Sequence, residues 1–84
     1  MSLRNKVADL LKTRLDASEI EVVDESAGHA GHSETGAHFF VHIVSPKFNG
    51  KTRIERHQMV YEALKDELRE NVHALRIRAL STED

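Results

Sequence analysis

The spacing of apolar residues predicts a helix in two parts of the chain. Near the start, leucine and valine recur at steps of three and four residues, the period of a helix that buries one face. These residues are Leu3, Val7, Leu10, Leu11 and Leu15. Ser2 is a suitable N-cap for this helix, and the segment 16–18 is expected to end it.

A second helix is predicted to begin at Thr52, because Glu55 follows three residues later and completes a capping-box pattern. An apolar line then continues for four turns. It consists of Ile54, Val60, Tyr61, Leu64 and Leu68. We expect one continuous helix that ends at the segment 70–71.

Three other segments have the pattern of β-strands. In the segment 19–24, Ile20 and Val22 alternate with acidic residues, as in a half-buried strand. The segment 38–44 predicts the strongest strand, and the segment 72–80 predicts the last one. In the middle strand, one face carries Phe39, Val41 and Ile43, and the other carries His38, Phe40, His42 and Val44. In the last strand, His73, Leu75, Ile77 and Ala79 share one face, opposite Arg76 and Arg78.

The connections between the strands differ in composition. Residues 26–37 hold three glycines and no apolar residue larger than alanine, which predicts a flexible surface loop. The segment 45–46 ends the middle strand, and the segment 47–50 predicts a turn or one short helical turn.

This order of elements predicts a single α+β domain over residues 1–84. The first two strands should pair antiparallel, and the last should lie parallel to the middle one, because a helix connects them. The result is a three-stranded mixed sheet with both helices on one face, in the order α-β-β-(short helical turn)-α-β.

The parallel pair has a consequence for the histidines, because parallel strands begin at the same end of a sheet. His73 opens the last strand, on the side expected to face the helices, and the loop with His29 and His32 leads into the middle strand at His38. The predicted topology therefore gathers histidines at one end of the sheet. Imidazole is the commonest metal ligand, and a His-x-x-His pair with a distant third histidine can bind zinc or copper.

Composition narrows the chemistry. The 84 residues include six histidines and no cysteine, which excludes disulfides, thiolate zinc sites, thiol nucleophiles and an iron–sulfur cluster held by the chain's own sulfur. The net charge of −2 provides no overall basic field for nucleic acid. No apolar segment approaches the roughly 20 residues of a membrane span, and no signal-peptide pattern opens the chain, so a cytoplasmic location is expected.

Several polar residues have ordinary structural interpretations. His57 lies within the apolar line of the second helix and is expected to be half-buried, whereas His38 and His42 are expected on the surface of the sheet. Ser45 and Thr52 have no recognisable nucleophile context. No catalytic constellation emerges, so we expect a protein that is not an enzyme.

Four stretches in the same order resemble the BolA family. They are His38–Ser45, Phe48-x-Gly50-Lys51, Arg56–Tyr61 and Val72–Leu75. The resemblance covers nearly the whole chain and implies a fold similar to a type II KH domain.

The resemblance also implies a partner, a monothiol glutaredoxin with a Cys-Gly-Phe-Ser motif. The two proteins would share a 2Fe–2S cluster, with sulfur from the glutaredoxin cysteine and glutathione. This chain would supply two ligands, the histidine that matches His73 and a loop histidine that matches His29, with His32 as the alternative. Residues expected to contact the partner are Lys51, Arg56 and His57.

Two other interpretations stay open. Some BolA-like proteins are described as transcriptional regulators, with the turn and second helix compared to a helix-turn-helix. Residues that would contact DNA here are Lys47, Lys51, Arg53 and Arg56, and Arg76 and Arg78 add charge on the open sheet face. The third interpretation is a structural interaction module that binds no metal.

Overall fold

The computed structural model describes residues 2–25, 37–70 and 72–83. The elements in chain order are α1 (Leu3–Arg14), β1 (Glu19–Asp24), β2 (Ala37–Val44), the 3₁₀ turn η2 (Pro46–Phe48), α2 (Arg53–Ala63), α3 (Lys65–Glu70) and β3 (Val72–Leu80). None of these helices is long and apolar enough to cross a membrane.

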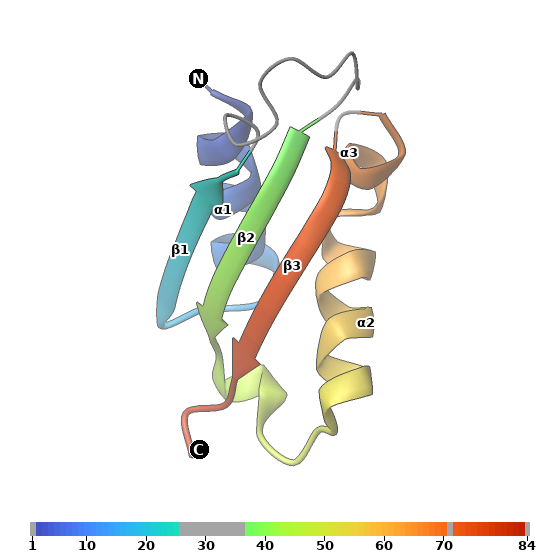
Figure 1. The fold of residues 1–84 in the computed structure, drawn as a ribbon. Helices are drawn as coiled ribbons and strands as arrows, with labels where there is room; N and C mark the ends of the chain where they lie inside the picture. The colour runs from blue at the N-terminus through green and yellow to red at the C-terminus, as the bar shows by residue number, and fades with distance from the viewer. Residues whose placement is uncertain (1, 26–36, 71, 84) are drawn as a thin grey trace.

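The three strands form one sheet in the order β1-β2-β3. β1 pairs antiparallel with β2, and β2 pairs parallel with β3, as predicted. The helices lie on one face of this sheet, while the other face is open (Figure 1). The predicted α+β class and element order are therefore confirmed.

The hydrophobic core lies between the sheet and the helices. On β2, Phe39, Val41 and Ile43 are buried, while His38 and His42 on the opposite face are partly exposed. The predicted assignment of the two faces of this strand is confirmed. The other buried apolar residues are Val7, Leu11, Leu15, Val22, Phe48, Val60, Ala63, Leu64 and Val72.

The second helix differs from the prediction. It is divided at Leu64 into α2 and α3, and two members of the predicted apolar line are exposed, Ile54 by 70% and Tyr61 by 44%. The buried face instead carries apolar residues at Val60, Ala63 and Leu64, and then an acid, Glu67. Because Glu67 is polar, a search for regularly spaced apolar residues does not recognise its position as buried.

Glu67 is buried because α1 supplies a partner. The Nζ atom of Lys6 lies 3.2 Å from its Oε1 atom. A buried carboxylate is tolerated when a cation compensates for the lost water. This ion pair joins the first helix to α3 and explains how an acid occupies a helix face directed toward the core.

The start of α2 matches the predicted capping box. The Thr52 hydroxyl accepts a hydrogen bond from the Glu55 backbone N–H, and the Glu55 carboxylate accepts one from the Thr52 backbone N–H. These bonds stabilise the ionised carboxylate, and they place the pKa of Glu55 below its ordinary value, with a smaller contribution from the charge of Lys51.

The connection from β2 to α2 contributes to the core. The predicted short helical turn is the 3₁₀ turn η2, and it buries the ring of Phe48 completely. Ser45 begins this turn: its hydroxyl donates to the Leu15 carbonyl and accepts from the Lys47 N–H. Gly50 follows with φ +76, a backbone conformation that favours glycine.

Candidate functional sites at the two ends of the sheet

His73 is the second residue of β3, and its backbone lies beside the start of β2. The register pairs Ala37 with Val72 and His38 with Ala74, so His73 lies opposite the step from residue 37 to 38. β2 and β3 begin at the same end of the sheet (Figure 1). The predicted neighbourhood of His73 and His38 is confirmed for the backbone, while the His73 side chain lies outside the described part.

The two loop histidines, His29 and His32, lie outside the described residues, so the predicted histidine cluster stays a prediction. The described residues at the ends of this segment are nevertheless adjacent. The backbone N–H of Glu25 donates to the carbonyl of His38 over 2.7 Å. The described residues on either side of the segment 26–36 therefore lie at the end of the sheet where β3 begins.

The alternation of faces in β3 is interrupted next to His73. Leu75, Ile77 and Ala79 pack against the core as predicted, but Val72 is also buried, at an odd spacing from them. The shift in register between residues 37 and 38 accounts for this change, since a bulge moves the following side chains to the other face. The helix-facing position of the His73 side chain stays a prediction, because that side chain lies outside the described part.

Two other histidines have the surroundings expected from the sequence. His42 lies on the open face of the sheet, where its Nε2 atom is 3.6 Å from a carboxylate oxygen of Glu19 on β1. His57 is half-buried on α2, as predicted. Within the described ranges, no group of three or more histidine, aspartate or glutamate side chains is placed to hold a metal ion.

The opposite end of the sheet carries a basic hollow of about 400 Å³ between the start of α2 and the end of β3. From the α2 side it is lined by Lys51, Arg53, Arg56 and His57, and from β3 by residues 77–80. None of the described residues that line it is acidic. We call this site the basic hollow.

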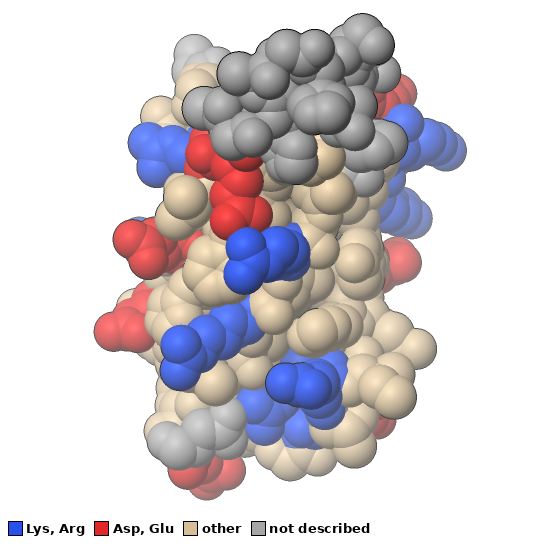
Figure 2. All heavy atoms as spheres, in the orientation of Figure 1, with Lys and Arg blue, Asp and Glu red and all other residues tan. Residues whose placement is uncertain are grey.

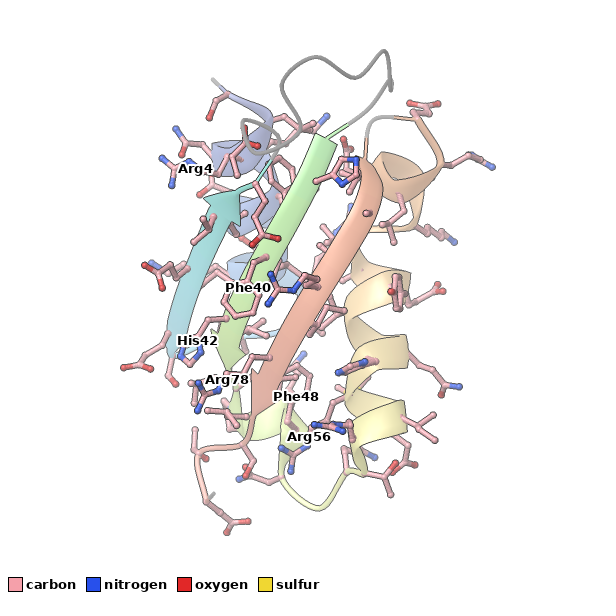
Figure 3. All side chains as sticks on the ribbon, in the orientation of Figure 1. Arg4, Phe40, His42, Phe48, Arg56 and Arg78 are labelled. Carbon is pink, nitrogen blue, oxygen red and sulfur yellow. The ribbon has the colours of Figure 1, made fainter. Side chains whose placement is uncertain are left out.

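Arg56 connects the two walls of the basic hollow. Its Nε atom donates to the Lys51 carbonyl over 3.0 Å, and its Nη1 atom donates to the Ala79 carbonyl over 3.1 Å. In Figure 3, Arg56 extends from the lower end of α2 toward the lower end of β3. These two bonds hold the guanidinium in place before any ligand arrives.

The structure separates the predicted site residues into two groups. His73 lies where β3 begins, whereas Lys51, Arg53, Arg56 and His57 surround the place where it ends. Ala79 lies six positions after His73 on the extended strand, a distance of about 20 Å. Lys47 belongs to neither group, because it does not line the hollow and its Nζ atom donates to the Arg14 carbonyl.

Arg76, predicted to add basic charge on the open sheet face, has its charge paired in the structure. Its guanidinium forms an ion pair with Glu25 at 2.7 Å and lies over the ring of Phe40, 5.1 Å from its centroid. Phe40 and Arg76 are register partners on β2 and β3. The sequence predicts the parallel pairing of these strands but not which residues lie opposite each other. A prediction of that register would have placed Arg76 beside Phe40.

Comparison with known proteins agrees with the fold. Residues 11–84 match the family model described as BolA-like protein. A SufE-like protein 1, chloroplastic/mitochondrial, from Arabidopsis thaliana is 39% identical over 82 residues, which are 88% of this chain and 22% of that protein. The DNA-binding transcriptional regulator BolA of Escherichia coli is 33% identical over 84 residues, covering 100% of this chain and 80% of the regulator.

A solved structure supports the same assignment. The BolA domain of SufE1 from Arabidopsis thaliana superposes with a TM-score of 0.88 at 40% identity, covering 99% of this chain and 95% of that domain. This chain spans about a fifth of the whole plant protein and four-fifths of the bacterial one. The match of the family model, the sequence identity and the shared fold show that the chain belongs to the BolA-like protein family.

Proposed function

We propose that this protein is a non-enzymatic adaptor that binds a monothiol glutaredoxin and shares a 2Fe–2S cluster with it. In this role it would act in iron–sulfur cluster assembly and delivery, or in iron regulation. The observation that carries the proposal is the position of His73 at the start of β3, beside the start of β2, where the segment that contains His29 and His32 rejoins the sheet.

The donor set of this chain fits a shared cluster better than one held alone. Iron–sulfur clusters accept imidazole in place of thiolate on one iron, and that exchange raises the reduction potential. The chain has histidines at this end and no cysteine anywhere. His73 and His29, or His32 as the alternative, would therefore supply imidazoles, while the glutaredoxin and glutathione supply sulfur. The cluster itself would provide redox-active, transferable iron.

The proposed partner contacts extend to the other end of the molecule. Lys51, Arg56 and His57 lie about 20 Å from His73 along the strand direction. A standard interface buries about 800 Å² on each partner, which is a patch about 30 Å across. One glutaredoxin can therefore contact both His73 and the basic residues at the other end of the sheet. The basic residues would lie at the rim of this interface and attract acidic groups of the glutaredoxin.

Mixing the protein with a cluster-loaded monothiol glutaredoxin and glutathione tests the proposal. We expect a heterodimer in size-exclusion chromatography and a visible circular dichroism spectrum different from that of the glutaredoxin alone. The matched control is the same glutaredoxin preparation without this protein. Failure to form a heterodimer, with an unchanged spectrum, would contradict the proposal.

The second candidate function is DNA binding through the turn and α2. The observation that favours it is that three of its four predicted residues, Lys51, Arg53 and Arg56, line one hollow without an acid. Gel-shift assays with duplex DNA at low salt measure DNA binding. If the protein binds DNA, we expect a complex whose affinity falls as salt is added and in the Arg53→Gln variant. A duplex that does not shift at low salt contradicts it.

A further inference from the structure

The basic hollow carries positive charge from the side chains of Lys51, Arg53 and Arg56. Among the described residues, no carboxylate lies within ion-pair distance of Lys51 or Arg53. Glu55, the acid in the first turn of α2, is instead bound to Thr52 through the capping box. Figure 2 shows several basic side chains over the lower half of the open sheet face, and acids along the β1 edge, near the top of the sheet and at the bottom of the view. The charge of Lys51 also acts on Glu55, whose pKa it lowers, whereas Arg53 has no acidic partner in the described structure. An anion in the hollow would gain favourable Coulomb energy from these cations.

The hollow is also organised in advance. Arg56 is tied to both walls through the carbonyls of Lys51 and Ala79, so its planar guanidinium has a set direction. A pre-oriented guanidinium loses less conformational entropy when it meets an oxyanion, and arginine and lysine together are typical of phosphate recognition.

The β3 wall offers room for an uncharged part of a ligand. Ile77, Ala79 and Leu80 are partly exposed apolar residues that line the hollow. Arg78 also lines it, but Figure 3 shows its side chain crossing the open sheet face away from Arg56. A volume of about 400 Å³ is within the range of small-molecule sites.

We propose that the basic hollow binds the phosphate group of a small molecule about the size of a mononucleotide. The Lys51, Arg53 and Arg56 side chains would surround the phosphate, and the apolar β3 wall would contact the rest of the ligand. This site is at the opposite end of the sheet from His73 and is independent of cluster ligation.

The charge distribution favours a compact anion over a long one. Nucleic-acid affinity requires several phosphate contacts along a continuous basic track. Here Arg76 is already paired with Glu25, and the acids Glu55 and Glu62 of α2 line a neighbouring groove that Lys51 also lines. These acids limit the basic surface around the hollow, which suits one phosphate group better than a long polyanion.

Titration by ¹⁵N NMR at low salt tests the proposal, with inorganic phosphate and a nucleoside monophosphate as separate probes. We expect saturable shifts of the amides at 53–57 and 77–80, with tighter binding of the mononucleotide. Arg53→Gln and Lys51→Gln should each weaken binding about tenfold, since each removes one charged contact. Arg76→Gln removes the same charge outside the hollow and should leave the affinity unchanged.

Three results would overturn the proposal. The first is the absence of saturable shifts with both probes. The second is equal weakening by Arg76→Gln and Arg53→Gln, which would show diffuse electrostatic attraction. The third is binding of a duplex oligonucleotide at these amides without binding of the mononucleotide, which would assign the hollow to nucleic acid.

Discussion

Replacing Phe48 by alanine is expected to remove a large part of the stability of the fold. The ring is completely buried in the core, and truncating such a residue costs about 3–5 kcal/mol through lost burial and a residual cavity. A chain of this length has a free energy of unfolding of about 4–13 kcal/mol, so the loss is a large fraction of the total. Urea denaturation followed by circular dichroism measures the effect.

Tyr61→Ala is the matched control, because it removes a ring from a side chain that is 44% exposed. It should cost about 1 kcal/mol, in proportion to the smaller apolar area that it buries. If the two variants had similar urea midpoints, the turn η2 would not be part of the core, and the packing described for Phe48 would be wrong.

Replacing His73 by alanine is expected to remove the cluster-bearing form of the glutaredoxin complex. Under the proposed function this imidazole ligates iron, and loss of a ligand should accelerate cluster loss by roughly tenfold or more, because even outer-shell changes at metal sites cost that much. The visible circular dichroism spectrum of the mixture and its decay measure the effect.

His42→Ala is the control for this experiment. His42 lies on the same sheet, but its register partner is Arg78, toward the far end of β3. This variant should retain the spectrum of the wild-type complex. An unchanged spectrum in the His73 variant, with its fold intact by far-ultraviolet circular dichroism, would rule out His73 as a ligand.

Local patterns in the sequence predicted most of the architecture. The alternation in β1 and β2, the cap at Ser2 and the capping box at Thr52 all match the structure. These features depend on residues close together in the chain, where period and capping chemistry act directly. The parallel pairing of β2 and β3 followed from the helical crossover between them.

The buried face of α2 and α3 was not predictable in the same way. Glu67 lies on that face because Lys6, distant in sequence, compensates its charge. Ile54 fits the apolar period but is exposed, because no other element covers that side of the first turn. Burial depends on what packs opposite a residue, and periodicity does not contain that information.

The candidate sites also include features that the sequence predicted and features that only the tertiary structure shows. By itself, the sequence determined the order of the elements, the pairing of the strands and the position of His73 at the start of the last one, and its lack of cysteine excluded thiolate ligands from this chain. Only the tertiary structure decided that Lys51, Arg53 and Arg56 surround a hollow at the opposite end, and that Arg76 is neutralised by Glu25. Charge and ligand geometry depend on distances across the fold, and those distances exist only once the helices pack on the sheet.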